Sequence, residues 1–412
     1  MKNKIKLAVV AVLALGTTSA FATNGAALIG MGAEARGMAG TGIGMAHGAE
    51  SALTNPALIT SVENTEISFG GTFFMPDVSN TNNVGRGDSS SDSAADMSMI
   101  PEVSLATKIN EHFYVGIGMW GTGGMGVDYR DAKSIMAGGT QMQMVTNLQL
   151  MQFGVPLAYT TNGFSIAITP ILQYGSLDIN YEYPGSRNPQ DPNQPGDTIG
   201  MGVAQDLEFG YNIGLAYQIK GFTVGAIYKS QIDMEYKGFS SVVNPFTATN
   251  YTNDKLSTPA EMGIGASYAF GEHSVAIDYK MIQWSDAKGY EDFEWDDQDV
   301  ISIGYEYKTK GWAARLGYNY ATSPISEQNY NGFNGVGLSA GTVNTFNLLG
   351  FPGIVESHYA IGGSYDLSEQ TSFDLAFTYA PEVTETYKNF ANQDITTKHS
   401  QTGVSAQLNF NF

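Results

Sequence analysis

The chain has 412 residues with 20 basic and 40 acidic side chains, a net charge of −20 that argues against nucleic acid as a partner. It has no cysteine, so disulfides contribute nothing to its fold. Only 15% of the residues are charged, whereas glycine (49), tyrosine (23) and phenylalanine (21) are abundant, which argues against disorder and is typical of membrane β-barrels.

Residues 1–22 have the pattern of a secretory signal peptide. Lys2, Lys4 and Lys6 precede an apolar run over 7–15, and Ala20-Phe21-Ala22 forms a small-residue cleavage site. The alternative is a membrane anchor, but the apolar run is too short to span a bilayer as a helix. We therefore predict that the exported chain begins at Thr23. Because no later stretch of ~20 apolar residues follows, any membrane insertion has to use a closed barrel.

Residues 23–62 have little strand character and are interrupted by glycines, with alanines and methionines between them. A disordered leader is the alternative, but the segment is poor in the charge that favours disorder. We predict short helical turns and compact coil, which form a plug or hatch in front of a barrel over residues 63–412.

From residue 64 onward the side chains alternate between apolar and polar, as in strands with lipid on one side and a wet interior on the other. Short turns and long connections then follow each other in strict alternation, which is typical of periplasmic turns and external loops. Fourteen strands are predicted, in the ranges 66–73, 98–108, 112–120, 147–160, 164–175, 207–219, 222–236, 257–270, 273–284, 299–308, 312–321, 357–367, 371–380 and 404–412. A barrel of this size has an interior too wide for side chains alone to fill, and the segment before it has about the right length to occupy it.

Particular motifs resemble one known family. Arg36–Gly42 followed by Asn55-Pro56-Ala57 is similar to the hatch signature of the long-chain fatty acid outer membrane transporters, the FadL/OmpP1/TodX group. The resemblance continues through downstream motifs that include Pro76–Val78, Pro259–Met262, Trp284-Ser285, Arg315–Gly317 and the aromatic C-terminus. It implies an all-β, 14-stranded antiparallel barrel in the bacterial outer membrane with an N-terminal hatch. It also implies passive transport, in which ligand leaves sideways beside an inward-kinked third strand once the mature N-terminus shifts.

Two groups of residues are candidates for gating. Pro56 fixes its own φ and favours an extended Asn55, whose side chain can hydrogen-bond nearby backbone, so Asn55, Pro56 and Ala57 are predicted to form a rigid contact between hatch and wall. An ordinary turn is the alternative. Gly116 and Gly118 lie in the third strand, where glycine weakens the ladder and permits a kink. Their spacing also fits a dinucleotide-binding fingerprint, but no βαβ unit surrounds it.

Apolar residues within predicted external loops are candidates for ligand contact. The loop 121–146 contains Met125, Met136, Met142 and Val145, and methionine adapts to varied apolar shapes. The loop 331–356 is also rich in apolar residues. External loops should be polar, so these residues form either a capture groove or the packing by which loops cap the barrel.

Three basic residues are predicted by strand parity to point inward: Lys229, Lys280 and Arg315, with Asp233 and Asp278 as neighbours. The family resemblance implies that such residues neutralise a fatty acid carboxylate. A structural network of ion pairs between hatch and wall is the alternative, because a buried charge must be paired. The polar but not basic segment 176–180 departs from the family pattern and keeps neutral aromatic or aliphatic hydrocarbons open as ligands.

No metal, cofactor or catalytic residue is predicted. The histidines lack metal-ligand spacing, and the acidic run 291–299, which could bind a divalent cation, matches no calcium loop. The expected partners are a hydrophobic small molecule and the lipid and lipopolysaccharide of the outer membrane around a monomer. The alternatives to a gated transporter are a general porin-like barrel and an outer-membrane enzyme such as a lipase, for which no serine–histidine pair can be assembled.

Overall fold

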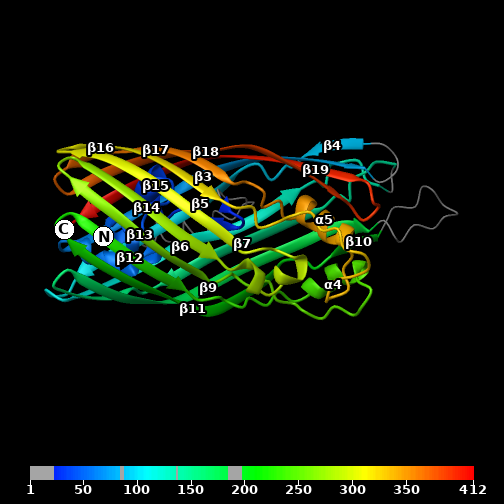
Figure 1. The fold of residues 1–412 in the computed structure, drawn as a ribbon, viewed down its shortest axis with the longest axis horizontal. Coiled ribbons are helices and arrows are strands. Elements are labelled where there is room, and N and C mark those ends of the chain that lie inside the picture. The colour runs from blue at the N-terminus through cyan, green and yellow to red at the C-terminus, as the bar shows by residue number, and fades with distance from the viewer. Residues whose placement is uncertain (1–22, 84–87, 136–137, 184–196) are drawn as a thin grey trace, which may run out of the picture.

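The protein forms one closed antiparallel β-barrel (Figure 1). The structure is a computed structural model and describes residues 23–83, 88–135, 138–183 and 197–412, so the predicted signal peptide and Met136 lie outside the described residues. The wall consists of β3 (Thr65–Asn83), β5 (Ser98–Lys108), β6 (Phe113–Asp128), β7 (Val145–Gly154), β8 (Leu157–Thr161), β9 (Phe164–Tyr183), β11 (Ala204–Ile219), β12 (Phe222–Lys229), β13 (Glu261–Phe270), β14 (His273–Ile282), β15 (Gln298–Thr309), β16 (Trp312–Ala321), β17 (Ser357–Ser368), β18 (Thr371–Lys388) and β19 (Asp394–Asn411).

Because β7 and β8 both pair with β6 and with β9, they form one wall strand interrupted at Val155-Pro156. The wall therefore has the predicted fourteen strands, and pairing of β19 with β3 closes it. The other strands are short: β4 (Asp88–Asp92) and β10 (Asp197–Gly200) extend external hairpins, and β1 (Thr23–Asn24) and β2 (Ala27–Leu28) lie inside the barrel.

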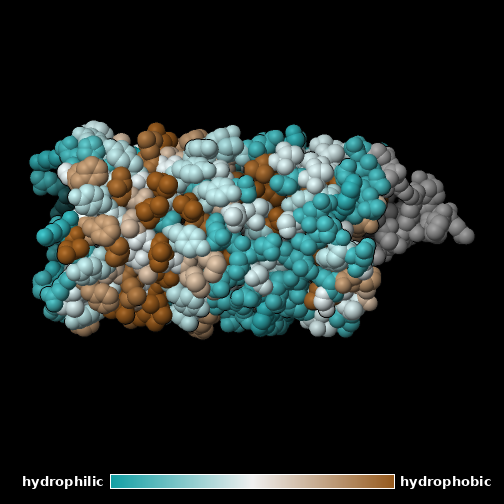
Figure 2. Space-filling view, viewed as in Figure 1, coloured by the Kyte–Doolittle hydropathy of each residue, from teal (hydrophilic) through white to brown (hydrophobic). Residues whose placement is uncertain are grey.

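The alternation predicted for the wall is confirmed. In β19, Ser405, Gln407 and Asn409 are buried inside the barrel, whereas Val404 and Leu408 between them are more exposed on the outer face. Figure 2 shows the hydrophobic side chains concentrated in a band around one half of the barrel and hydrophilic side chains over the half that carries the external hairpins. Among the described residues, no helix is long and apolar enough to cross a membrane.

Several predicted strand ends were wrong. β3, β6, β9, β11 and β18 continue past the predicted ends of their strands, and residues 121–128, predicted as loop, belong to β6. The backbone ladder does not need lipid, so a hairpin continues beyond the band after the apolar alternation stops. The strand predicted over 222–236 ends at Lys229, because residues 230–236 turn into the barrel, where Ile232 bridges to Thr258.

The interior is filled from both ends. Residues 23–62, which we call the plug segment, contain α2 (Gly32–Gly37), η1 (Gly48–Glu50), α3 (Ser51–Thr54) and η2 (Pro56–Ser61) and lie inside the wall (Figure 1). The loops at the other end carry α4 (Phe239–Val243), η4 (Asn244–Phe246), η5 (Trp284–Asp286), η6 (Glu291–Phe293) and α5 (Ala340–Leu349). Almost every residue of α5 is buried, so the apolar loop 331–356 caps the barrel.

Candidate functional site

Asn55 connects the plug segment to the wall by its side chain. The residue is extended, with φ −137° and ψ 99°, as expected before a proline. Its amide nitrogen donates to the carbonyl oxygens of Ile43, at 2.7 Å, and of Leu215 on β11, at 3.1 Å. Its side-chain oxygen accepts from the Ala57 backbone N–H at 3.1 Å. The amide is thus satisfied on both sides, and Asn55-Pro56-Ala57 lies where the sequence predicted a contact between hatch and wall.

The wall meets the plug segment with glycines that the sequence analysis did not single out. A Cβ on Gly225 of β12 would collide with the Ile43 carbonyl oxygen, and one on Gly214 of β11 would collide with Asn55. Gly265, Gly304, Gly317 and Gly362 of β13, β15, β16 and β17 likewise face plug residues at distances that leave no space for a side chain. These six residues, which we call the glycine seats, let the plug segment pack directly on the wall backbone. Their spacing along each strand gives no local signal, because it depends on where the plug segment lies.

Charged residues fix the same segment at three further points. Arg36 forms a bidentate ion pair with Glu102 of β5, in which its two terminal nitrogens lie 2.5 and 2.7 Å from the two carboxylate oxygens. Arg315 of β16 contacts Glu34 of α2 at 2.9 Å and Glu306 of β15 at 2.8 Å. Arg315 therefore points inward as predicted, but it lies in an ion-pair network between plug and wall. Such a network satisfies charges that would be costly to bury alone.

Asp278 of β14 provides the third point of attachment. Its carboxylate accepts hydrogen bonds from three successive backbone N–H groups of the plug segment, those of Gly42 at 2.7 Å, Ile43 at 2.8 Å and Gly44 at 3.3 Å. Successive N–H groups that converge in this way form an anion-binding nest. The plug segment supplies the nest and the wall supplies the anion.

The wall has a break beside the third strand, β6. β5 pairs with β6 only from Lys108 to Glu102, which lies opposite Trp120. Beyond that point β5 continues to pair with β3, whereas β6 follows β7 through a bulge between Gly121 and Gly123. Gly116 and Gly118 lie below the break, where the ladder with β5 is still intact. The break thus lies in the third strand but beyond its predicted range of 112–120 and beyond the predicted glycines.

The plug segment covers the break from inside. Ala27 of β2 pairs with Gly123, and the Gly124 backbone N–H donates to the Ala26 carbonyl oxygen at 3.1 Å. We call residues 23–28 the arm. In contrast to the rest of the plug segment, the arm contains no charged side chain, so no ion pair of its own side chains fixes it.

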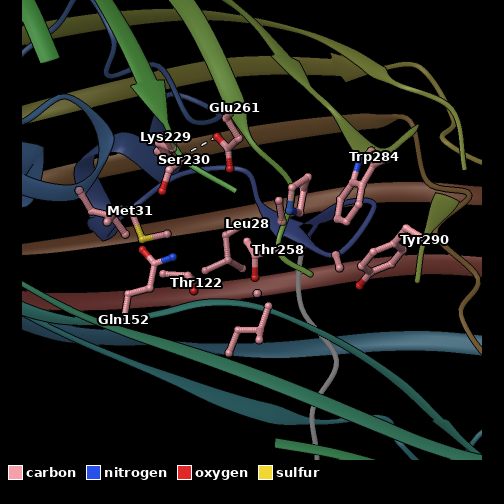
Figure 3. Close-up of a pocket in the computed structure, with 16 residues that line it drawn as sticks. Leu28, Met31, Thr122, Gln152, Lys229, Ser230, Thr258, Glu261, Trp284 and Tyr290 are labelled. Carbon is pink, nitrogen blue, oxygen red and sulfur yellow. Dashed lines mark ion pairs between the residues drawn. The ribbon is translucent and has the colours of Figure 1, made fainter. Parts of the chain in front are cut away.

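A cavity lies directly behind the arm (Figure 3). It has an empty volume of about 610 Å³, counted up to its open mouth. Leu28, Met31, Leu150 and Trp284 contribute an apolar lining, and Thr122 of the β6 bulge lines it with a buried hydroxyl for which the structure shows no hydrogen-bond partner.

The cavity is bounded at one end by charge. Lys229 of β12 lies 3.3 Å from the Glu261 carboxylate, and Lys280 of β14 lies 3.5 Å from the same oxygen (Figure 3 shows Lys229 and Glu261). A smaller neighbouring cavity shares Lys229 and Glu261 and includes Lys280. Two ammonium groups share one carboxylate, and Asp278, which lines the smaller cavity with them, accepts hydrogen bonds from the plug segment. Both lysines point inward as predicted, but their partner is Glu261, whereas Asp233 pairs with Lys255 and Lys288 and Asp278 binds the plug segment.

The predicted loop residues separate into different environments. Met125 lines a small cavity with Thr23 of the arm, and Met142 is fully buried in the apolar core under the loops. Val145 is half-buried and alternates with inward-facing Thr146 on β7, so it faces away from the interior. The structure therefore brings Met125 near the arm but does not bring Met125, Met142 and Val145 together as a groove.

The external loops also hold the polar clusters. Asp233 is flanked by Lys288 at 2.8 Å and Lys255 at 3.3 Å; partial burial raises its pKa, but hydrogen bonds from Lys288, Gln231 and Ser257 outweigh burial and hold the pKa well below the usual range. In the acidic run, Asp292 accepts hydrogen bonds from Tyr251 and Asn253. No group of side chains suited to hold a metal occurs in the described part of the chain.

A closed barrel with an apolar outer band, an interior segment and a break beside a cavity defines an integral outer-membrane barrel built for transport. The family described as outer membrane protein transport protein (OMPP1/FadL/TodX) matches residues 9–332, and the chain belongs to this family. Its members are transport proteins of the outer membrane, not enzymes.

Two relatives and two solved structures illustrate the similarity. The chain is 24% identical over 404 residues to the 47 kDa outer membrane protein of Pasteurella multocida. The matched region covers 90% of this chain and 92% of that protein. It is 26% identical over 349 residues to a long-chain fatty acid transport protein of Escherichia coli, and this match covers 69% of this chain and 76% of that protein. The fold matches a Pseudomonas aeruginosa FadL homologue, with a TM-score of 0.68, 14% identity and coverage of 94% and 100%. It also matches the Pseudomonas putida toluene transporter TodX, with a TM-score of 0.67, 18% identity and coverage of 93% of this chain and 99% of that one.

Proposed function

We propose that the chain mediates passive, gated uptake of long-chain fatty acids or related hydrophobic molecules, with lateral release into the bilayer. The observation that carries the proposal is the break between β5 and β6, which lies beside an amphipathic cavity and is covered from inside by the arm. A ligand in the cavity lies behind the arm, and the break gives it a short route to lipid. Moving an alkyl chain from water into lipid is favourable by about 0.8 kcal/mol per CH₂, so no energy source is required.

The charged end of the cavity favours an acid as ligand. Lys229 and Lys280 together carry one positive charge more than Glu261 neutralises, and a ligand carboxylate would balance it. Relatives and structural neighbours include both a long-chain fatty acid transport protein and a toluene transporter. Neutral hydrocarbons are therefore the second candidate, favoured by the apolar lining formed by Leu28, Met31, Leu150 and Trp284. In either case we propose a monomer in a membrane of lipid and lipopolysaccharide.

Uptake of radiolabelled oleate by a strain that lacks the gene and its paralogues, with and without the wild-type gene, tests the transport proposal. We expect uptake to depend on the gene. Equal uptake by both strains would reject transport of fatty acids, and the same pair of strains given radiolabelled toluene tests the second candidate. Steady ion conductance of the wild-type protein in planar bilayers would instead favour the porin alternative.

A disulfide across the break tests lateral release. The chain has no native cysteine, and Leu28 and Thr122 lie next to the Ala27–Gly123 bridge and line the same cavity. We expect the double variant Leu28→Cys/Thr122→Cys to lose uptake when oxidised and to regain it with reductant, because the cross-link holds the arm on β6. The two single-cysteine variants are the controls. Full uptake by the oxidised double variant, with the cross-link verified, would show that ligand takes another route.

A further inference from the structure

A chain of hydrogen bonds holds the first residue of the arm. The backbone nitrogen of Thr23 donates to Oε1 of Gln401 on β19 at 3.2 Å. The same oxygen lies 3.1 Å from Nε2 of His358 on β17, and Nε2 of Gln401 lies 3.3 Å from Nε2 of His399 on β19. Nδ1 of His399 lies 2.9 Å from the carbonyl oxygen of Pro352. The side chains of Gln401, His358 and His399 are all buried.

Only one arrangement of protons satisfies the contacts of His399 when its ring is neutral. The Pro352 carbonyl oxygen can only accept, so Nδ1 of His399 carries the hydrogen and Nε2 is the acceptor. The Gln401 amide must then turn its NH₂ group to His399 and its carbonyl oxygen to Thr23. The neutral imidazole thus sets the orientation of the amide that holds the arm.

Protonation of His399 makes this arrangement inconsistent. Nε2 would then carry a hydrogen and face the Gln401 NH₂ group, so two donors would oppose each other at 3.3 Å. Rotation of the amide removes that conflict, but it presents the NH₂ group to the Thr23 N–H, which loses its acceptor. His358 is not sensitive in the same way, because its Nδ1 faces the Asn319 side-chain oxygen at 3.2 Å, an acceptor that suits a protonated ring.

The surroundings of His399 allow the proton to act. His399 lines the small cavity beside the break together with Thr23, Met125 and Pro352. Its wall neighbours are uncharged: Val78 of β3 and Val383 of β18. Of the nearest carboxylates along the strands, Asp77 is exposed on the other face of β3, and Glu356 accepts from the Ser323 backbone N–H. In the described part of the chain, the titratable group facing this network is thus the other imidazole, His358, joined by the Thr23 α-ammonium once the predicted signal cleavage has occurred.

We propose that His399 is a proton-sensitive latch, so that acidification releases Thr23 and moves the arm away from the break. This inference rests on the proposed function, because it regulates the same lateral exit. Burial disfavours the charged imidazole, so the latch should hold at about pH 7.5 and weaken as the pH falls to about 4. A newly formed α-ammonium would act in the same direction, because two like charges would then lie close to each other.

Arm mobility in the mature protein tests the latch without any ligand. A spin label on Ala27→Cys, in protein reconstituted into phosphatidylcholine vesicles, reports the mobile fraction at about pH 7.5 and about pH 4. We expect the ratio of mobile to immobile label to rise about fivefold on acidification, the change produced by loss of one hydrogen bond. His399→Gln should remove the pH dependence, whereas His112→Gln, at an exposed histidine near the β5–β6 turn, should leave it as in the wild type.

Gln401→Glu separates a latch from a merely structural contact. A carboxylate accepts at both oxygens, so it can hold Thr23 while it accepts from a protonated His399. This variant should keep the arm immobile at about pH 4. A wild-type arm that does not respond to pH, or a His399→Gln arm that still responds, would overturn the latch. Oleate uptake by the wild type at about pH 7.5 tests the transport proposal separately, so failure of one does not imply failure of the other.

Discussion

At the scale of single residues, this protein places charge inside a membrane barrel and balances almost all of it. Arg36, Arg315 and Asp278 each join the plug segment to the wall, which makes them structural. Lys229 and Lys280 differ, because they share Glu261. An incompletely balanced charge beside a cavity is a candidate for ligand recognition, since buried charges are otherwise paired.

Lys280→Met should therefore lower uptake of oleate by about tenfold while leaving uptake of oleyl alcohol nearly unchanged, because a hydrogen bond to a charged group contributes about 1.5–3 kcal/mol. The variant should fold, since Glu261 keeps Lys229 as its partner. Lys310→Met, at an exposed periplasmic turn, is the matched control. Equal losses for the acid and the alcohol would mean that Lys280 does not recognise the carboxylate.

At the scale of elements, the plug segment and β6 are each divided into a fixed part and a free part. Residues 30–62 rest on the glycine seats and on three charged contacts, whereas the arm holds by backbone bonds to β6 and Gln401. β6 belongs to the regular wall up to Trp120 and leaves β5 beyond it. The arm meets the part of β6 beyond Trp120 at the break. We therefore expect the arm to move before the remainder of the plug segment does.

Gly225→Ala tests the fixed part. Its methyl group would collide with the Ile43 carbonyl oxygen and displace the loop that also binds Asp278 and Asn55. We expect thermal unfolding at a lower temperature, by an amount that corresponds to about 1–3 kcal/mol, together with raised ion conductance. Gly335→Ala, in a loop position with open space around it, should change neither property. If Gly225→Ala changed neither the ion conductance nor the unfolding temperature, the close packing of the plug segment on Gly225 would be contradicted.

At the scale of the whole molecule, the barrel is closed at one end by the plug segment and capped at the other by α5 and its neighbouring loops. On the face shown in Figure 2, the hydrophobic side chains lie over the half of the barrel that contains the plug segment. We propose that this arrangement keeps water from passing straight through and leaves the ligand a route to the side.

Deletion of residues 23–62, with the signal peptide retained, should convert a nearly silent protein into a steadily conducting one in planar bilayers. The wall should still form, because its fourteen strands pair with each other and the inward charges left without partners would be hydrated by water in the lumen. A scrambled plug of the same composition is the control. Unchanged conductance after the deletion would show that the external loops alone close the barrel.

The sequence by itself determined the barrel, because lipid on one side and a wet interior on the other impose a period of two on every strand, as in Val404–Asn409. It also predicted the contact of Asn55 with the wall, since proline restricts the residue before it by local sterics. Only the tertiary structure decided the partners. The glycine seats, the Glu261 pair of lysines and the Thr23–Gln401–His399 contacts join residues far apart in the chain, and no local pattern records which strand faces which part of the plug segment. The break at Gly121–Gly123 lies where β2 meets β6, and a Cβ on Gly123 would collide with the Ala26 carbonyl oxygen, so the sequence supplied the glycine and the packed interior decided its use.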